Sequence, residues 1–598
     1  MRSIKFSAAF VVLAGMAVGQ SSKYSPDLSK EQPSTNLNVI VQYDHDPNLL
    51  DELNVALHGG TYRATLPSIR AGAYSMSAAA LAEIAADSHV VHVSPDRAIT
   101  GKLDYANSAV NATVAAQQYG VTGKGIGVAI LDSGITTPNP DFGSRVVYSQ
   151  DFTGGNGQDQ FGHGEHVAGI IAGNGSHSHC SSCTRSLQGL APDANIISLR
   201  VLDANGASTD SIVISAIETA IQFKNVYNIR VMNLSLGRPV IESYTQDPLC
   251  QAVEAAWKAG IVVVVAAGND GRLNPIDNYG YLTVNAPGND PYVITVGAMK
   301  TEATYTRTDD LMASYSSKGP SLVDFVAKPD IVAPGNLIVS TLSSTKATLP
   351  KLYPQDLIPT SYYDSKGNSS ISPYYYTLSG TSMAAAVVSG SVADLLQAQP
   401  NLTPDQVKAR LMLTSYKTFP SSSVAVDPTT GLSYVDYYDV LTRGAGYLDL
   451  AEALTMKDSV SGSALSPNIN LNTSTGQLYL QFNSSSVWAL SGSSSTYSPS
   501  HVWGNAGLIG NGNVIASVSP TLSPSNILSI LSELWGTSAA WGTSAAWGTS
   551  AAWGTSAAWN TSAVWGTSAV WGTSAVWGTS SVAASSAQTG DVSVVGEQ

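Results

Sequence analysis

Cysteine, clustered basic charge and long apolar runs are all scarce in this sequence. The 598 residues include 3 cysteines, so at most one disulfide can form within the chain. Lys and Arg number 29 against 43 Asp and Glu, which gives a formal net charge of -14, and the basic residues form no cluster. Because phosphate binding needs concentrated Lys and Arg, a nucleic-acid partner is not expected. No run beyond the N-terminus reaches the roughly 20 apolar residues of a membrane span, so none is expected.

The N-terminus has the pattern of an export signal. Arg2 and Lys5 precede an apolar run from Phe6 to Val18, and the small residue Gly19 suits a signal peptidase. The run is too short for a membrane anchor. We therefore expect residues 1–19 to be a cleaved signal peptide and the protein to be secreted, which agrees with its low charged fraction of 12%.

The stretch Gly380–Ala384 contains a candidate nucleophile. It reads GTSMA and opens an alanine-rich segment that is predicted to stay helical to about Gln399. At a helix start, backbone N–H groups lack intrahelical partners and the dipole adds partial positive charge, so an oxyanion beside Ser382 would be stabilised there. A serine at such a position is usually only a helix cap. The interpretation of Ser382 therefore depends on partners elsewhere in the chain.

Three further polar residues stand where a parallel sheet presents chemistry. Asp132 comes directly after the apolar run Ile126–Leu131, and Asn269 follows the buried run Ile261–Ala266. His163 begins a second helical pattern. Because ligands bind beyond the carboxyl ends of parallel strands, we expect these side chains to meet at one edge of the sheet. They would supply a carboxylate, a base and an amide donor to the candidate nucleophile.

Together these stretches resemble the subtilisin-like serine proteases (subtilases). The order Asp132, His163, Ser382 matches that family's triad, and LDSGI, GHGEHVAG, AAGN and GTSMA stand at compatible spacing within about residues 106–455. The resemblance implies an α/β fold with a parallel β-sheet flanked by helices on both faces. It also implies peptide-bond hydrolysis through an acyl-enzyme on Ser382, with Asn269 binding the oxyanion and no cofactor required for the chemistry. Glu165 departs from the family, which usually has Thr there.

A groove for substrate backbone is expected beside the triad. The segment before the helix predicted at residues 211–223 resembles the family's edge strand that pairs with substrate, and residues 235–237 resemble its counterpart on the other side. An extended peptide held this way is bound by main-chain hydrogen bonds, which demand no particular sequence. The residues assigned to substrate binding are Gly206, Ser208, Ser235, Leu236, Gly237, Ala267 and Gly268.

Residues 20–105 are expected to hold a folded unit ahead of the peptidase domain. Over about residues 37–100 the pattern reads strand, helix, strand, strand, helix, strand, which predicts a small α+β module of the ferredoxin-like type. Its position resembles the propeptide of a subtilase, a folding template that blocks the cleft as an intramolecular inhibitor until it is cut away. The alternative is an ordinary N-terminal domain that stays attached.

Asp141 is a candidate metal ligand. It stands at a place that resembles a calcium ligand of some subtilases, whereas the family's second calcium loop is replaced here by residues 174–183. A structural calcium ion at Asp141 is one interpretation. A solvated turn residue is the other.

Two of the three cysteines lie in one loop. We predict that Cys180 and Cys183 close a local disulfide in an exported protein. With His177 and His179 they form an alternative metal cluster, but ligands so close in sequence surround a tetrahedral ion poorly. Cys250 is left over and is expected to be buried on a helix.

The composition changes beyond the peptidase domain. Residues 456–534 are rich in Ser, Asn and Gly and are expected to form a linker. Residues 535–582 repeat the hexapeptide WGTSA(A/V), which places every Trp on one face of an extended strand but scatters them around a helix. Residues 583–598 form a C-terminal tail. We interpret the repeats either as a flexible low-complexity tail, or as a stacked β-solenoid or a strand array for surface attachment.

Two functions agree with these features. The first is a secreted serine endopeptidase, made as a self-processing proenzyme and expected to be a monomer, that acts on protein or peptide substrates. The second is a surface or matrix repeat protein whose peptidase domain serves only its own maturation. They differ in whether the chain digests an unrelated protein.

Overall fold

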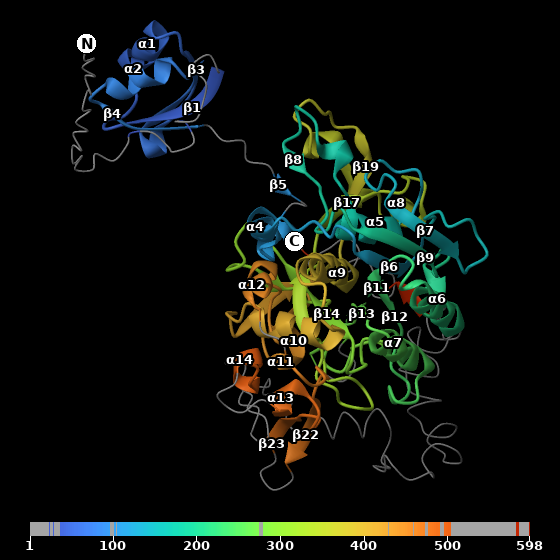
Figure 1. The fold of residues 1–598 in the computed structure, drawn as a ribbon. Coiled ribbons are helices and arrows are strands. Elements are labelled where there is room, and N and C mark those ends of the chain that lie inside the picture. Colours follow the sequence, from blue (N-terminus) through green and yellow to red (C-terminus); the bar gives the residue numbers. More distant parts are fainter. Residues whose placement is uncertain are drawn as a thin grey trace, which may run out of the picture. The chain divides into compact units, whose positions relative to one another are not determined.

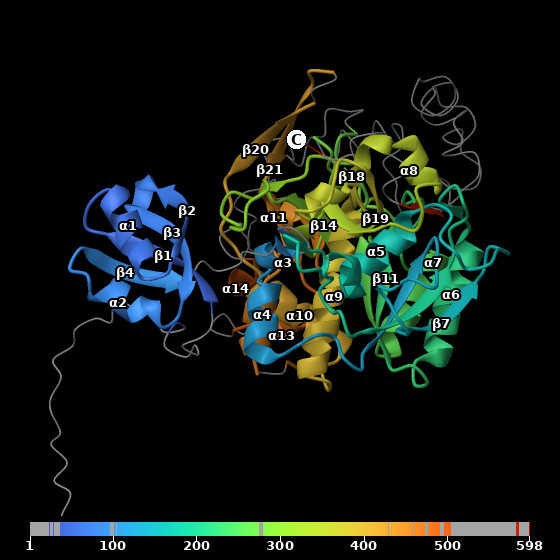
Figure 2. The same ribbon diagram turned by 90° about the horizontal axis from the view of Figure 1, so that it is seen from above.

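The chain forms two compact units, Met1–Thr100 and Gly101–Gln598. The computed structural model (Figures 1 and 2) describes residues 23, 28, 36–95, 101–102, 105–273, 279–427, 430–457, 460–472, 477–490, 496–503, 582–584 and 597. The expected signal peptide over residues 1–19 and the expected repeats over residues 535–581 lie outside the described residues.

The first unit is a four-stranded antiparallel sheet with two helices. Its strands are β1 (Asn36–Tyr43), β2 (Thr61–Leu66), β3 (Ala71–Ser77) and β4 (Val90–Pro95), in the spatial order β2-β3-β1-β4, and its helices are α1 (Leu49–Leu57) and α2 (Ala80–Ala86). Val39 and Val41 alternate along β1 and are fully buried in one core cluster with Val55 of α1 and Ile84 of α2. The observed order of elements is that of a ferredoxin-like α+β module.

The second unit is organised on an eight-stranded sheet in the order β15-β14-β13-β11-β6-β9-β7, with β16 also pairing with β14. Its pairings are parallel except that of β14 with β15. Strands β6, β13 and β14 are buried over their whole length, which explains why they read as continuous apolar runs. The strands are β6 (Gly127–Asp132), β7 (Val146–Asp151), β9 (Asn195–Arg200), β11 (Ile229–Leu234), β13 (Val262–Ala266), β14 (Ile294–Lys300), β15 (Leu311–Met312) and β16 (Ile331–Pro334).

Two pairs of helices cover this sheet (Figure 1). Helices α5 (His163–Ala172) and α9 (Thr381–Ala398) pack against each other on one face, and α6 (Asp210–Phe223) and α7 (Pro248–Lys258) pack against each other on the opposite face. Helix α9 is buried along almost its entire length, which accounts for its run of Ala and Val residues. The expected α/β fold, with a parallel sheet flanked by helices on both faces, is confirmed.

The remaining elements of the second unit surround this core. The short helices are α3 (Ala106–Ala109), α4 (Ala112–Tyr119), α8 (Thr348–Leu352), α10 (Pro404–Thr414), α11 (Val440–Arg443) and α12 (Leu450–Thr455). The short strands are β5 (Gly101–Lys102), β8 (Arg185–Ser186), β10 (Ala207–Ser208), β12 (Leu236–Gly237), β17 (Ile338–Thr341), β18 (Leu357–Pro359), β19 (Ile371–Leu378), β20 (Ser422–Val426) and β21 (Ser433–Tyr437).

The described part of the expected linker is folded onto the second unit. Strand β22 (Asn468–Asn472) pairs with β23 (Gln477–Gln481), and the helices α13 (Val487–Leu490) and α14 (Pro499–Trp503) follow. Trp488 and Trp503 are 1% and 2% exposed, and their rings meet edge to face with centroids 5.2 Å apart. Both belong to a core cluster with Met412 of α10. The expectation of a linker beginning at residue 456 is therefore wrong for the residues described up to 503.

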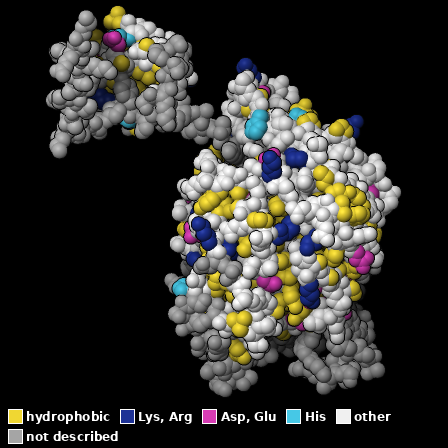
Figure 3. All heavy atoms as spheres, in the orientation of Figure 1, with side chains coloured by type: hydrophobic (Ala, Val, Ile, Leu, Met, Phe, Trp, Pro, Cys, Tyr) yellow, Lys and Arg dark blue, Asp and Glu magenta, His cyan; other side chains and the backbone are white. Residues whose placement is uncertain are grey.

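No helix among the described residues is long and apolar enough to cross a membrane. On the face of the molecule shown in Figure 3, charged side chains are scattered among uncharged ones. This surface agrees with the low charged fraction of the sequence, 12%.

We predict that the folded segment after α12 is required for the stability of the peptidase unit. Replacing Trp488 by Ala removes a ring that packs on Trp503 and a hydrogen bond from Nε1 to the carbonyl of Leu465 (2.9 Å). The free energy of unfolding should fall by about 3–5 kcal/mol, as is typical of buried aromatic truncations. Urea unfolding measures this loss.

Leu490→Ala is the matched control for this prediction, because Leu490 lies in the same helix but is 60% exposed. Its effect should stay within about 0.5 kcal/mol. Equal stability of the two variants would contradict the packing of this segment.

Candidate active site

A buried carboxylate and an imidazole meet at the carboxyl end of β6. Asp132, the last residue of β6, is 1% exposed, and its Oδ1 accepts hydrogen bonds from Nδ1 of His163 (2.7 Å) and from the N–H of Ser133 (2.7 Å). His163 is the first residue of α5 and is fully buried. With Nδ1 donating to Asp132, the neutral ring presents Nε2 as its acceptor. Among the described residues Nε2 has no hydrogen-bond partner.

Two residues that sequence reasoning did not single out hold this pair in place. Asp159 accepts hydrogen bonds from the N–H groups of Gly162 (2.7 Å) and Glu165 (2.8 Å) and so caps the start of α5. The hydroxyl of Ser133 donates to Asp159 (2.8 Å) and accepts from the N–H of Gly164 (2.8 Å). Burial raises the pKa of Asp159 to about 6. The end of β6 and the start of α5 are thus joined by side chains as well as by packing.

Ser382 lies in the first turn of α9, the helix that packs against α5. Its Oγ donates a hydrogen bond to the carbonyl of Ser235 (3.3 Å), and the hydroxyl of Ser235 donates to the carbonyl of Ser382 (3.0 Å). The structure therefore places the three expected triad residues on elements that pack together, with the carboxylate and imidazole already hydrogen-bonded. In unliganded sites the bond from nucleophile to base commonly tightens only when substrate binds.

Asn269 is fixed by the residue that precedes the candidate nucleophile. Its Oδ1 accepts hydrogen bonds from the N–H (2.9 Å) and the Oγ1 (3.0 Å) of Thr381. Because Oδ1 faces Thr381, the amide nitrogen faces the other way as a donor. Thr381 Oγ1 also accepts from the N–H of Gly268 (3.1 Å). Gly268 has a φ of +109°, and an added Cβ would lie 2.7 Å from Nδ2 of Asn285, so this close approach requires glycine.

The residues assigned to substrate binding lie on or beside two short strands. Ser208 belongs to β10, and Leu236 and Gly237 form β12. Both strands pair antiparallel with a third strand, β24 (Val582–Ala584). The other four assigned residues lie next to strands: Gly206 precedes β10, Ser235 precedes β12, and Ala267 and Gly268 follow β13. An added Cβ at Gly206 would meet the ring of Phe161 at 2.5 Å, which keeps this position small.

The two polar residues next to His163 on α5 have structural partners. The carboxylate of Glu165 accepts hydrogen bonds from the N–H of Thr136 (2.6 Å) and the amide of Asn139 (2.6 Å), and burial raises its pKa to about 8. The ring of His166 is bonded through Nε2 to the carbonyl of Ile338 (2.9 Å), and burial lowers its pKa to about 3. Glu165 therefore connects the start of α5 to the loop after β6 through these two hydrogen bonds.

Asp141 does not fit a calcium site. It is fully buried, and its Oδ1 accepts hydrogen bonds from the hydroxyl of Ser176 (2.6 Å) and the N–H of His177 (3.2 Å), while Oδ2 accepts from the hydroxyl of Tyr375 (2.7 Å). Calcium takes six to eight oxygen ligands, whereas protein donors surround this carboxylate. The interpretation of Asp141 as a solvated turn residue is therefore wrong, because the residue joins two loops from inside the fold. Nothing in its hydrogen bonds favours the interpretation as a calcium ligand, which the prediction below tests.

Cys180 and Cys183 form a disulfide, with Cα atoms 4.9 Å apart, so that prediction is confirmed. The two histidines of the alternative metal cluster have other partners: His177 Nδ1 bonds to Asp141 (3.3 Å), and His179 Nε2 bonds to the hydroxyl of Ser186 (2.5 Å). Cys250 is buried on α7, as expected, and burial raises the pKa of its thiol.

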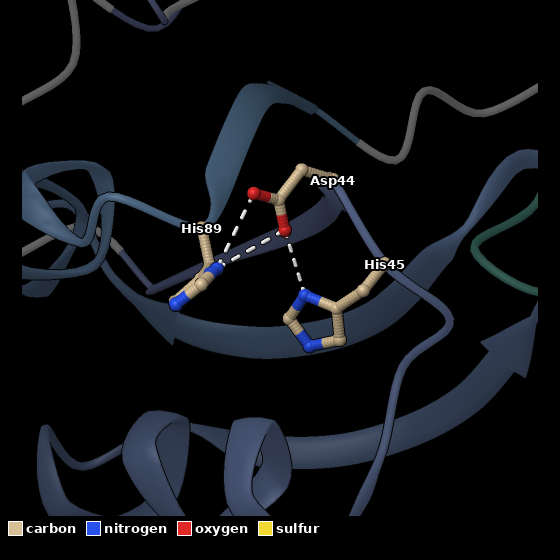
Figure 4. A group of neighbouring side chains, drawn as sticks. All are labelled: Asp44, His45 and His89. Atoms are coloured by element: carbon tan, nitrogen blue, oxygen red, sulfur yellow. Dashed lines mark hydrogen bonds and ion pairs between the residues drawn. The ribbon is translucent and has the colours of Figure 1, made fainter.

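In the part of the chain that the structure describes, one group of three side chains has the composition of a metal site. Asp44, His45 and His89 lie together in the first unit, where both imidazoles face the Asp44 carboxylate (Figure 4). Nδ1 of His45 and Nδ1 of His89 bond to Oδ1 of Asp44 at 2.7 and 3.1 Å. These bonds lower the pKa of Asp44, and the bond to Asp44 raises the pKa of His45. The hydrogen bonds account for the cluster without an ion.

We predict that Thr381 positions the oxyanion donor. Thr381→Val keeps the shape of the side chain but removes the hydroxyl that bonds to Asn269 and accepts from Gly268. Loss of about 1–1.5 kcal/mol of hydrogen bonding in the transition state should lower kcat for a peptide substrate about tenfold, with KM little changed. Steady-state kinetics measure both constants.

Thr381→Ser restores the hydroxyl and should recover most of the lost kcat. If the Ser variant is as slow as the Val variant, the methyl group matters rather than the hydrogen bonds, and the positioning role is refuted.

We also predict that Asp141 stabilises the fold without calcium. Asp141→Asn replaces one acceptor oxygen by a donor that faces buried donor groups, which should cost about 1–3 kcal/mol of unfolding free energy. The loss should be the same with added calcium and with a chelator, as measured by thermal unfolding. Asp193→Asn, at an exposed position, is the control. If the chelator destabilises the wild type but not Asp141→Asn, Asp141 is a calcium ligand after all.

Known proteins resemble this chain over its second unit. A model of the Subtilase family matches residues 123–441, more than half of the chain. Serine protease AprX of Bacillus subtilis (strain 168) is 38% identical over 334 residues, which cover 54% of this chain and 69% of that protein. Subtilisin DY of Bacillus licheniformis is 32% identical over 301 residues, which cover 50% of this chain and 86% of that protein. A crystal structure of a cold adapted subtilisin-like serine proteinase shares 28% identity with a TM-score of 0.36, over 50% of this chain and 85% of that one.

The family match and the two relatives lead to the same conclusion as the α/β fold and the order of the sequence motifs. The chain belongs to the subtilase family and is a subtilisin-like serine endopeptidase.

Proposed function

We propose that this chain is a secreted endopeptidase, made as a self-processing proenzyme, that cleaves protein or peptide substrates through an acyl-enzyme on Ser382. The observation that carries the proposal is the 2.7 Å hydrogen bond between Asp132 and His163, buried where β6 ends and α5 begins. Helix α9, which carries Ser382, packs against α5. No group other than these side chains and backbone donors is needed for the chemistry.

The proposed roles follow from the chemistry of the groups. Ser382 Oγ attacks the substrate carbonyl while Nε2 of His163 takes its proton, and Asp132 holds the ring by its Nδ1–H and stabilises the imidazolium. The tetrahedral oxyanion accepts hydrogen bonds from the Asn269 amide and the N–H of Ser382. Collapse breaks the C–N bond, and His163 gives its proton to the leaving amine. Water activated by His163 then hydrolyses the ester.

Substrate selection in this proposal rests on the backbone. The strands β10 and β12 each have an edge that pairs with an added antiparallel strand. Such pairing favours extended or unfolded segments and places few demands on their sequence. Small residues at Gly206, Ala267 and Gly268 keep the backbone of a substrate close to the enzyme.

The first unit is proposed as the propeptide, on the basis of its ferredoxin-like order of elements and its position ahead of the peptidase unit. It would act as an intramolecular inhibitor until it is cleaved near residue 105. Export by the proposed signal peptide at residues 1–19 and action as a monomer complete the proposal.

Ser382→Ala should abolish both self-processing and digestion of an unrelated unfolded protein. Loss of the nucleophile should lower kcat by about 10⁶, the size of the effect in subtilisin. Mass spectrometry of the exported protein should find residues near 20 at the N-terminus of the variant and a new N-terminus near residue 105 in the wild type. Release of peptides from reduced casein measures digestion.

Ser215→Ala is the matched control, because Ser215 is exposed on α6, and it should process and digest like the wild type. Wild-type protein that cuts itself but leaves casein intact would refute the endopeptidase proposal. That result would support a repeat protein whose peptidase domain serves only maturation.

A further inference from the structure

The C-terminal part of the chain returns to the proposed substrate groove. Strand β24, drawn red in Figure 1 beside β12, is inserted between β10 and β12. It is antiparallel to both: Ala583 pairs with Ala207 on one side and with Gly237 on the other. More than 300 residues separate β12 from β24 in the sequence. The three-stranded sheet is therefore formed by long-range pairing between distant parts of the chain.

The position of β24 is the one that an extended substrate would take. Its backbone is paired on both sides by the strands that we propose to bind substrate. In an antiparallel pairing, each step forward on one strand is a step back on the other. With Ala584 opposite Leu236, β24 runs toward Ser235, whose carbonyl accepts the hydroxyl of Ser382. The segment thus enters the groove in the direction that leads to the proposed nucleophile.

A second contact fixes the end of the chain, thirteen positions after Ala584. Glu597 is 7% exposed, and its Oε1 accepts hydrogen bonds from the N–H of Ser314 (2.8 Å) and from Arg272 Nη2 (3.0 Å). Nζ of Lys300 lies 3.5 Å from Oε2. The side chain of Asn336 bonds to both the N–H and the carbonyl of Glu597, each at 2.9 Å. Two cations and two neutral donors, the N–H and the hydroxyl of Ser314, surround the carboxylate and make this a built pocket for it.

This pocket borders the loops that carry the proposed catalytic groups. Arg272 follows Asn269 by three residues. Asn336 is adjacent to Gly335, whose carbonyl accepts from the N–H of Gly380 (2.8 Å), just ahead of the nucleophile. Glu597 is therefore bonded to Arg272 and Asn336, which come from the same loops as Asn269 and the Gly335 carbonyl.

We propose that the peptidase unit binds its own C-terminal segment: residues 582–584 occupy the substrate groove as a tethered competitor, and the pocket of Arg272, Lys300, Ser314 and Asn336 anchors Glu597. The assignment of the groove rests on the proposed function, whereas the Glu597 pocket does not. A tethered segment competes at an effective concentration in the millimolar range. Because three small residues bind weakly, the tether should raise the apparent KM of a peptide substrate about two- to tenfold and leave kcat unchanged.

Ala583→Pro tests the groove contact in the full-length, matured enzyme. Proline removes a main-chain donor in the middle of β24 and sets φ near −65°, away from the antiparallel value. Thr589→Pro, outside β24 and beyond the expected cut, is the matched control. Mass spectrometry first establishes whether the matured enzyme keeps the tail. If the tail is kept, Ala583→Pro should lower KM about two- to tenfold relative to the control, at equal kcat.

If the wild type instead trims its tail, the cut should fall at residues 585–587, directly after β24. Ala583→Pro should slow this cut about tenfold, whereas Thr589→Pro should leave its rate and position unchanged. Hydrolysis of that bond consumes one water, as for any substrate. If the enzyme keeps its tail and both variants have the same KM, the proposal is overturned. It is also overturned if the enzyme cuts its tail and Ala583→Pro changes neither the rate nor the position of the cut.

Glu597→Gln tests the anchor. Removing the carboxylate charge should free the segment and lower KM in the same direction as Ala583→Pro. If Glu597→Gln instead disturbs the loop that carries Asn269, kcat should fall. A lower kcat with an unchanged KM would overturn the anchoring role of Glu597. If no variant hydrolyses peptide or reacts with a fluorophosphonate, the proposed function fails. If the wild type and all variants hydrolyse the peptide with the same KM, the proposed function stands and only the inference about the tail fails.

Discussion

The hydrogen bond from His163 to Asp132 is the constraint around which the second unit is built. A carboxylate buried to 1% exposure is costly unless donors satisfy it, and here the donors are an imidazole N–H and the N–H of Ser133. Both donors reach the carboxylate only if the start of α5 lies beside the end of β6 in the fold. Asp159 enforces this by capping the helix and accepting the hydroxyl of Ser133. The orientation of the His163 ring thus depends on a buried polar network.

The sequence predicted those parts of the site whose signals are local. Asp132 and Asn269 each end a run of buried apolar residues, and a parallel sheet brings such ends to one edge. The disulfide of Cys180 and Cys183 was likewise predictable, because the two residues are three positions apart. The strands and helices of the first unit followed from their periodicity for the same reason. In each of these cases, neighbours in sequence determine the structure.

The features that sequence reasoning missed are all long-range contacts of ordinary residues. Thr381 is one letter of a motif, but its hydroxyl bonds to Asn269, 112 positions away. The sequence predicts a turn residue or a metal ligand at Asp141, but Asp141 accepts a hydrogen bond from the hydroxyl of Tyr375, 234 positions later in the chain. The segment around Trp488 has the composition of a linker, and only the packing of its two indole rings on α10 makes it part of the core. Composition cannot report which distant surface a side chain will meet.

Recognition through main-chain hydrogen bonds has a consequence for any chain with a long tail of small residues. A groove that accepts an extended backbone regardless of sequence cannot discriminate against segments of its own chain, which are present at a far higher effective concentration than free substrate. Such an enzyme must either lose its tail or hold it in a defined place. In our proposal, strand β24 between β10 and β12 and Glu597 in a pocket with two cations represent the second solution. An anchored segment would compete in one register, so the competition would be set by geometry rather than by the affinity of many alternative segments.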